Sequence, residues 1–340
     1  MNHNQHIIII AEAGVNHNGD YELARRMVLA AKEAGADYVK FQTAVPELVI
    51  STYAPKAEYQ KETTGEAQSQ LDMCRAIHLP LSDYAPLKAL CDEADIGFMS
   101  TPFDLVSIDC LAPLGMDYWK IPSGEITNLP YLRKIASQGG RVIMSTGMST
   151  LDEVETAVRI LEENGTGRDR IILLHCTTQY PTPFEAVNLR AMDALRTLGC
   201  AGVGYSDHTR GIAVPVAAAA LGACVLEKHF TLDRNLPGPD HKASLEPDEL
   251  AAMVREVREV EAALGDGCKR VAEAERANIT VARKSIVAAR HIAAGEVFTA
   301  DNITVKRPGN GMSPLLWDKV LGHRASQDYE ADRLIDEQID

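Results

Sequence analysis

Short apolar runs that alternate with amphipathic segments most restrict the fold of this chain. Eight such runs occur, at residues 7–11, 38–41, 97–99, 118–121, 142–144, 171–174, 202–205 and 224–226. Amphipathic segments with helical spacing lie between them, for example at 21–34, 81–94, 151–163 and 188–197. Eight strand–helix repeats over about 260 residues are typical of a (β/α)₈ TIM barrel. We therefore predict an α/β fold of this type.

An open, doubly wound α/β sheet is the structural alternative. However, no Gly-x-Gly-x-x-Gly pattern follows the first apolar run, which removes the usual dinucleotide-binding form of that fold. The connection between the second and third runs, residues 43–96, is unusually long. We expect an extra segment there that covers one end of the barrel.

The pattern changes after a predicted helix at 247–264. The Gly265-Asp-Gly sequence indicates the end of that helix, and short strands and turns follow a charged stretch. We predict a barrel domain over 1–265, a linker over 266–281 and a small β-rich domain over 282–340.

Composition excludes several classes of function. The 340 residues carry a net charge of −14, which argues against nucleic acid as a partner. No apolar stretch approaches the ~20 residues that a membrane span needs, and the first residues do not have the pattern of a signal peptide. The seven cysteines form no paired spacing, which suggests a reducing, cytoplasmic environment.

Two histidines 21 residues apart, His208 and His229, each end an apolar run. A helix is predicted between them, so the two runs form neighbouring parallel strands whose C-terminal ends lie together. Two imidazoles at one point are half of a metal site, which water and substrate would complete. Such ligands suit a divalent ion, with Mn²⁺ preferred here and Mg²⁺, Co²⁺ or Zn²⁺ also compatible. Ordinary hydrogen-bonded histidines are the alternative.

Polar residues end the other predicted strands as well, at the face where barrel enzymes carry their chemistry. One set consists of cations and hydroxyls, which suits a ligand with a phosphate and a carboxylate: Lys40, Thr101, Lys120, Ser123, Ser145 and Ser206. We expect this set to make the pocket cationic although the whole chain is acidic. Glu12, Glu125 and Asp240 are candidate acids and bases. Cys176, at the neighbouring sixth strand end, is interpreted as a packing residue.

Several longer motifs resemble the bacterial sialic acid synthase family. They include Ala11-Glu-Ala-Gly-Val-Asn-His-Asn-Gly-Asp, Lys40-Phe-Gln-Thr, Lys120-Ile-Pro-Ser-Gly-Glu, Tyr205-Ser-Asp-His and Glu227-Lys-His-Phe-Thr. Lys306-Arg-Pro-Gly-Asn-Gly is similar to the antifreeze-like (SAF) domain that ends members of this family. The resemblance covers nearly the whole chain, in order.

The resemblance implies a TIM barrel and a SAF domain in a domain-swapped homodimer. It implies a transferase that condenses phosphoenolpyruvate with an N-acetylmannosamine-type sugar, with C–O cleavage and release of phosphate. His208 and His229 would hold the metal, Glu12, Glu125 and Lys40 would be catalytic, and the cation and hydroxyl set would bind phosphoenolpyruvate. The implied sugar contacts are Gln42, Glu125, Tyr180, Asp240 and, from the partner's tail, Arg307. Thr178 stands where the family often has an asparagine.

Three further motifs, which begin at Ile126, His208 and Asp240, are similar to the branch of the family that makes N,N′-diacetyllegionaminate. The sugar would then be 2,4-diacetamido-2,4,6-trideoxymannose, and N-acetylmannosamine is the alternative. Two other functions are compatible with the residues. One is an aldolase or lyase of a sugar acid that forms a Schiff base through Lys120 or Lys228. The other is a non-catalytic carbohydrate-binding protein.

Overall fold

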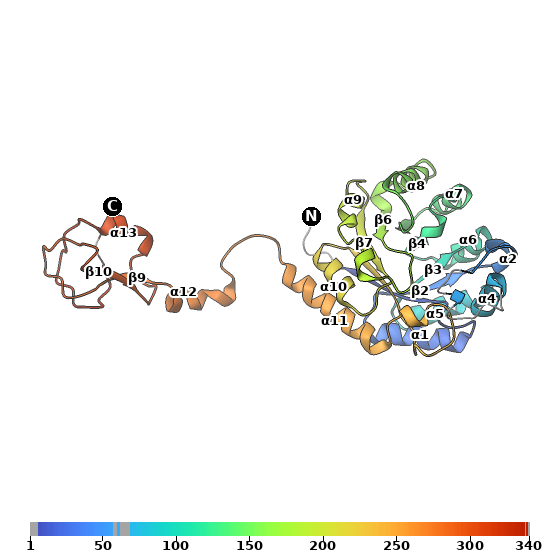
Figure 1. Cartoon of the computed structure of the whole chain (residues 1–340), viewed down its shortest axis with the longest axis horizontal. Coiled ribbons are helices and arrows are strands. Elements are labelled where there is room, and N and C mark those ends of the chain that lie inside the picture. Colours follow the sequence, from blue (N-terminus) through green and yellow to red (C-terminus); the bar gives the residue numbers. More distant parts are fainter. Residues whose placement is uncertain (1–5, 57–59, 62–68, 337, 339–340) are drawn as a thin grey trace. The chain divides into compact units, whose positions relative to one another are not determined.

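The computed structural model describes residues 6–56, 60–61, 69–336 and 338. The chain divides into two compact units, Met1–Asp266 and Gly267–Asp340, each considered separately below (Figure 1). In the described part of the chain, no helix is both long and apolar enough to cross a membrane.

Eight parallel strands form one sheet in the first unit, in the order β3-β2-β1-β8-β7-β6-β5-β4. They are β1 (Ile8–Gly14), β2 (Tyr38–Thr43), β3 (Gly97–Pro102), β4 (Tyr118–Ile121), β5 (Arg141–Ser145), β6 (Ile171–His175), β7 (Gly202–Asp207) and β8 (Val225–His229). The strands at the two ends of this order, β3 and β4, contact each other, which closes the sheet. The predicted TIM barrel is confirmed.

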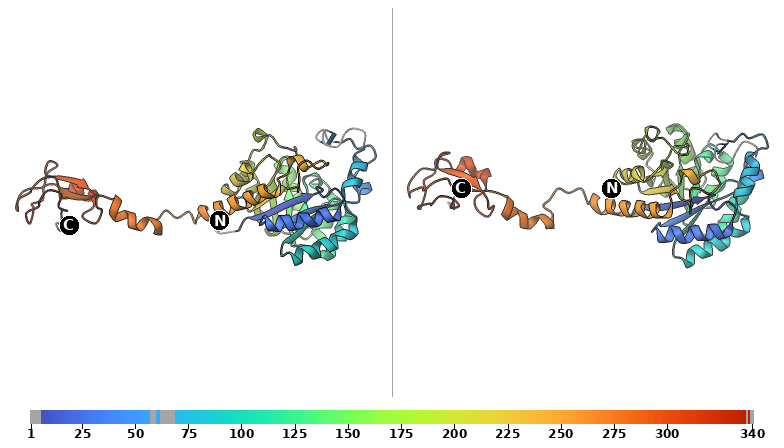
Figure 2. Two further views of the ribbon diagram at one scale, coloured as in Figure 1. Left: turned by 90° about the horizontal axis from the view of Figure 1, so that it is seen from below. Right: turned by 60° about the horizontal axis from the view of Figure 1, so that its bottom comes forward.

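Helices lie outside the strands (Figures 1 and 2). They are α1 (Tyr21–Glu33), α2 (Pro46–Val49), α4 (Gln70–Ile77), α5 (Tyr84–Glu93), α6 (Leu105–Leu111), α7 (Leu129–Ser137), α8 (Leu151–Glu163), α9 (Ala191–Arg196), α10 (Ala213–Ala220) and α11 (Pro247–Leu264). Short 3₁₀ helices are η1 (Leu81–Asp83), η2 (Ala112–Leu114), η3 (Ser123–Glu125), η4 (Arg168–Arg170), η5 (Phe184–Ala186) and η6 (His241–Ala243).

Side-chain caps fix where several of these helices begin. The Asp20 carboxylate accepts hydrogen bonds from the backbone of Glu22 and Leu23 at the start of α1. Thr150 and Glu153 form a reciprocal capping box at the start of α8. Each of these caps ends the loop between a strand and the next helix, so it also sets the length of that loop.

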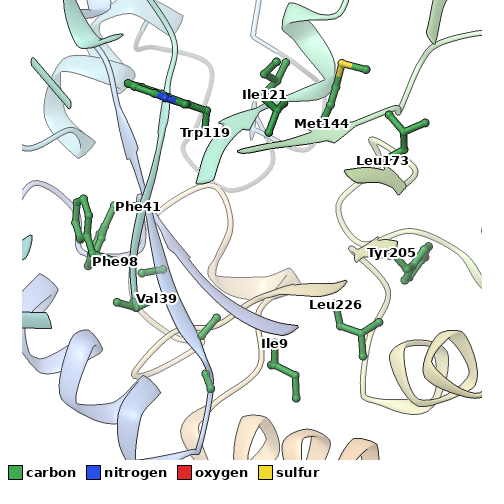
Figure 3. Packing of buried hydrophobic residues seen from close by; sticks show 14 of the residues in the cluster. Ile9, Val39, Phe41, Phe98, Trp119, Ile121, Met144, Leu173, Tyr205 and Leu226 are labelled. Carbon is green, nitrogen blue, oxygen red and sulfur yellow. The ribbon is translucent and has the colours of Figure 1, made fainter. Parts of the chain in front are cut away.

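The strands separate their side chains into two sets, as their period of two requires. One set packs with the helices in the main hydrophobic core, and Figure 3 labels members of it from all eight strands, among them Ile9, Leu173 and Leu226. The other set points into the barrel. Its lower layer is apolar and consists of Ile10, Met99, Tyr118, Ile143, Leu174 and Val225. The next inward residue along most strands is polar, so a polar layer lies directly above an apolar floor.

Several strands extend further than the sequence predicts. The seventh was predicted to end at 205 and continues to Asp207, and the eighth was predicted to end at 226 and continues to His229. The reason is that the polar residues still pair in the ladder, where Ser206 is opposite Glu227 and Asp207 is opposite Lys228. The polar residues of these strand ends therefore sit on rigid backbone.

The second unit contains η7 (Glu273–Glu275), α12 (Arg276–Ala282), β9 (Ser285–Ala288), β10 (Ile303–Lys306), η8 (Pro314–Leu316) and α13 (Trp317–Val320). β9 and β10 pair antiparallel. Ile286, Phe298, Ile303 and Tyr329 belong to a hydrophobic cluster that is separate from the barrel core. The predicted linker over 266–281 includes η7 and most of α12, and its limits remain a prediction.

Candidate active site

A cavity of about 300 Å³ lies at the C-terminal ends of the barrel strands, above the apolar floor. Most residues that the sequence analysis proposes for the site line this cavity. They are Glu12, Lys40, Gln42, Thr101, Lys120, Ser123, Ser145, Tyr180, Ser206, His208, His229 and Asp240. The structure thus brings together side chains from strand ends or from the loops that directly follow them.

Two proposed residues are not among those that line the cavity. The Glu125 carboxylate accepts a hydrogen bond of 2.6 Å from the Asn128 side chain, and its neighbour Gly124 lines the cavity instead. Arg307 is an exposed residue that follows β10 in the second unit. Its proposed approach to the sugar stays a prediction.

The two cavity lysines are buried and held by a network of hydroxyls and carboxylates. Lys40 Nζ lies 2.6 Å from Glu12 Oε2 and donates to Thr101 Oγ1 at 3.1 Å. Lys120 Nζ donates to Ser145 Oγ at 2.7 Å. Glu227, which the sequence analysis did not include in the site, lies between them.

Glu227 is 4% exposed and faces both lysines. Its Oε2 is 3.6 Å from Lys40 Nζ, its Oε1 is 3.7 Å from Lys120 Nζ, and Oε1 also accepts a 2.9 Å hydrogen bond from Ser206. Strand alternation could have identified it, because Glu227 stands two residues before His229 and therefore faces the same side. The pocket was expected to be cationic, but its lysines are largely compensated by Glu12 and Glu227.

Burial and neighbouring charges shift the pKa values of these groups in different directions. Burial raises the pKa of Glu227, but Lys120 and Lys40 outweigh it and bring the value to about 2. Burial lowers the pKa of Lys40, but Glu12 and Glu227 outweigh it, so the Lys40 pKa is raised. For Lys120, burial exceeds the attraction of Glu227 and the pKa is lowered. Burial also raises the pKa of Glu12, and it raises that of Asp240 to about 7.

The two predicted metal ligands lie next to each other at the ends of the paired strands β7 and β8, and both line the cavity. The ring centroids of His208 and His229 are 5.4 Å apart, and the Tyr180 ring contacts both of them. Burial lowers the pKa of both histidines, which favours the neutral form that a metal requires. Among the residues that the structure describes, no third His, Cys, Asp or Glu completes a metal-binding group with them.

Hydrogen bonding leaves suitable nitrogen atoms available. His208 Nδ1 donates to the Thr177 carbonyl at 2.6 Å, so its Nε2 carries a lone pair. His229 Nδ1 is buried and makes no hydrogen bond, with Asp240 Oδ2 3.9 Å away. A buried nitrogen without a partner is costly, and a metal ion would satisfy it. The residues therefore fit a divalent ion whose remaining ligands are water and substrate.

A lysine that was considered as a Schiff-base nucleophile faces away from the cavity. Lys228 is fully buried, and its Nζ lies 2.5 Å from Asp207 Oδ2 on the side of the sheet opposite to His229. Lys120, the other candidate, does line the cavity. Of the two candidate amines, only that of Lys120 faces the cavity.

The long second connection supplies the upper wall of the cavity. Met73, Cys74 and Ile77 of α4 and the following His78 line it, together with Gln60. Cys176, interpreted as a packing residue, also reaches the cavity, where its sulfur is 3.3 Å from Ser123 Oγ. The described part of this connection covers one end of the barrel, as expected. Residues 57–59 and 62–68 of the connection lie outside the described residues.

Comparisons with known proteins agree along nearly the whole chain. Residues 27–269 match the NeuB family and residues 283–338 match the SAF domain. An N,N′-diacetyllegionaminic acid synthase of Campylobacter jejuni is 52% identical over 97% of this chain and 99% of that protein. A protein of the same name from Legionella pneumophila is 45% identical, over 95% of this chain and 91% of that protein.

A solved structure supports the same relationship. It is the N-acetylneuraminic acid (sialic acid) synthetase of Leptospira borgpetersenii in complex with citrate. It is 35% identical, covers 81% of this chain and 91% of its own, and superposes with a TM-score of 0.70.

Proposed function

The chain belongs to the NeuB family, and we propose that it condenses phosphoenolpyruvate with an N-acetylmannosamine-type sugar to a sialic-acid-type product and phosphate. One observation carries the proposal: two buried lysines with hydroxyl partners and a pair of buried histidines line one cavity. The cations suit the phosphate and carboxylate of phosphoenolpyruvate. The named synthases among its relatives do not favour a Schiff-base aldolase.

The residues suggest how the reaction proceeds. Phosphoenolpyruvate would be bound and oriented by the two lysines, Lys40 and Lys120, and by the hydroxyls of Thr101, Ser123, Ser145 and Ser206. A divalent ion held by His208 and His229 would, when bound, polarise the sugar aldehyde. The C=C electrons of phosphoenolpyruvate would form the bond from carbon 3 to the aldehyde carbon, whose oxygen takes a proton. Water would add at carbon 2 and lose a proton. Phosphate would then leave by C–O cleavage, and the hydroxyl left at carbon 2 would lose its proton and become the keto group. Glu12 is the proposed acid and base at the cavity, with its raised pKa caused by burial. Glu125 was proposed for this role as well, but it would have to turn from Asn128 to reach the cavity.

We propose Mn²⁺ as the ion, with Mg²⁺ or Co²⁺ as alternatives, since neutral nitrogen and oxygen ligands admit all three. We also expect the reaction to take place in the cytoplasm. This expectation rests on the odd number of cysteines without paired spacing, which suits a reducing compartment.

We propose 2,4-diacetamido-2,4,6-trideoxymannose as the preferred sugar. Its second acetamido group and its methyl at carbon 6 make it less polar than N-acetylmannosamine. The cavity offers apolar side chains for such groups: Val15, Met73, Ile77, Phe103 and Met148. The identity to two N,N′-diacetyllegionaminic acid synthases points in the same direction.

Phosphate release with each sugar tests this preference. We expect kcat/KM for the trideoxy sugar to exceed that for N-acetylmannosamine by about tenfold or more, because each buried methyl or methylene contributes about 0.8 kcal/mol. An equal or higher value for N-acetylmannosamine would assign the chain to the N-acetylneuraminate synthases instead.

The substitution Glu227→Gln should weaken the use of phosphoenolpyruvate. The change keeps the shape of the side chain but removes the carboxylate that favours the charged form of Lys120. We expect KM for phosphoenolpyruvate to rise about tenfold, with a smaller change for the sugar. Steady-state kinetics with each substrate varied in turn measure both effects. Tighter phosphoenolpyruvate binding in Glu227→Gln would mean that Glu227 acts mainly by repelling the anion.

We propose a homodimer in which the SAF domain of one subunit serves the barrel of the other, with Arg307 contacting the N-acyl group of the sugar. Exposed apolar residues near the C-terminal ends of the strands support an interface around the cavity mouth. They lie at the first turns of α6, α7 and α8 or in the loop before α8: Leu105, Val106, Leu129, Met148 and Leu151. Arg307→Ala should raise KM for the sugar more than KM for phosphoenolpyruvate.

Complementation tests the domain swap. His229→Ala has a defective barrel and an intact tail, whereas Arg307→Ala has the opposite defect. Co-expression should restore activity at about a quarter of the sites, since half of the dimers are mixed and each has one intact site. The two single variants expressed alone are the controls. If co-expression restores nothing although mixed dimers form, each tail serves its own barrel.

A further inference from the structure

Lys228 is a buried cation that the proposed chemistry does not use. It is 0% exposed, as is its partner Asp207. Lys228 Nζ lies 2.5 Å from Asp207 Oδ2 and also donates to the Thr209 carbonyl at 2.5 Å. Neither Lys228 nor Asp207 lines the cavity.

The pair lies directly behind the two metal-binding histidines. Asp207 and Lys228 are opposite each other at the last rung of the β7–β8 ladder. Each immediately precedes a histidine, so strand alternation directs the ion pair to the outer side of the sheet and the imidazoles to the inner side. The separation of the two imidazoles therefore depends on the two strand ends that this pair joins.

The same carboxylate also fixes the turn that follows His208. Asp207 Oδ1 accepts a hydrogen bond of 3.1 Å from the Thr209 backbone, and Oδ2 accepts one of 3.0 Å from its hydroxyl. With Lys228 bound to the Thr209 carbonyl, both sides of His208 are held by directional bonds.

A buried ion pair is a poor source of stability, because desolvation cancels most of its attraction and apolar residues of similar size serve equally well. Unlike apolar side chains, Asp207 and Lys228 form directional bonds, which fix the orientation of the two strand ends. The groups that support metal ligands commonly act in this way, and removing them weakens metal binding by about 10- to 100-fold.

We propose that Asp207 and Lys228 are positioning residues that hold His208 and His229 at the spacing a divalent ion requires. This inference rests on the metal role in the proposed function. Neither residue of the pair lines the cavity, so the pair would act through the histidines.

Mn²⁺ binding to the metal-free full-length protein, measured by calorimetry without substrates, tests the inference. We compare wild type, Lys228→Met and the double variant Asp207→Val/Lys228→Met. The single variant leaves a buried carboxylate unpaired and should lose both stability and affinity. The double variant removes both charges and should recover part of the stability, although the buried Thr209 backbone N–H and hydroxyl lose their acceptor. Its Mn²⁺ dissociation constant should stay about tenfold or more above that of wild type.

A matched control separates positioning from general destabilisation. Val257→Ala creates a cavity under the fully buried face of α11 and should lower the unfolding temperature without changing Mn²⁺ affinity. The inference is wrong if the double variant binds Mn²⁺ as tightly as wild type, or if Val257→Ala loses as much affinity at equal stability. Failure of wild type to bind Mn²⁺, Mg²⁺ or Co²⁺ would instead reject the metal role itself.

Discussion

Replacement of His229 by alanine is expected to lower kcat by at least about a thousandfold, because the metal contributes several kcal/mol to the transition state and each 1.36 kcal/mol is tenfold in rate. The protein should remain folded. His229 makes no hydrogen bond through its buried Nδ1, so its loss leaves no partner unsatisfied there. Initial rates of phosphate release measure the loss, and thermal unfolding should change by only a few degrees.

His175→Ala is the matched control for this variant. His175 likewise ends a barrel strand, β6, but its Nε2 donates to the Val187 carbonyl and it does not line the cavity. We expect reduced stability and preserved turnover. Chelation of divalent ions should reproduce the His229→Ala defect in wild type, and added Mn²⁺ should reverse it. Full activity in chelated buffer would reject the metal assignment.

Replacement of Lys120 by methionine should reduce kcat/KM for phosphoenolpyruvate by about ten- to a hundredfold, since hydrogen bonds to charged groups contribute about 1.5–3 kcal/mol. Methionine keeps most of the length of the side chain but removes the buried cation and the donor to Ser145. The effect should fall mainly on phosphoenolpyruvate and much less on the sugar. Kinetics with each substrate varied separately measure this difference.

Lys32→Met serves as the control, because Lys32 is partly exposed and pairs with Asp95 away from the cavity. Its kinetics should match wild type. Lys120 is also the remaining candidate for a Schiff base, so borohydride should be added to wild type with pyruvate. A covalent adduct that is lost in Lys120→Met would contradict its assignment as an anion ligand.

The barrel could be predicted from the sequence because its signal is local. Apolar runs and amphipathic helices reveal their periods within a few residues. The ends of the strands were harder to predict from the sequence. Inward polar residues such as Ser206 and Glu227 resemble loop residues, although they still pair in the ladder. Their strand character depends on the neighbouring strand, which the local sequence does not contain.

The site could be predicted in part. Histidines, lysines and hydroxyls at successive strand ends converge because parallel strands share one edge, and the structure places most of them around one cavity. The charge balance was not predicted, because Glu227 is recognisable only when its contacts to Lys40 and Lys120 are known. The contribution of α4 depends on how the long second connection folds back over the barrel. Glu125 does not line the cavity in this structure, where its carboxylate in η3 accepts a hydrogen bond from Asn128, and its role stays a prediction.

Phosphate release on mixing tests the central claim most directly. Protein with Mn²⁺, phosphoenolpyruvate and 2,4-diacetamido-2,4,6-trideoxymannose should release one phosphate for each nine-carbon keto acid that forms, as mass spectrometry can verify. With phosphoenolpyruvate labelled at the bridging oxygen, the label should appear in the phosphate, because the C–O bond breaks. A product that forms from pyruvate without phosphate release, or no product with either sugar, would contradict the account.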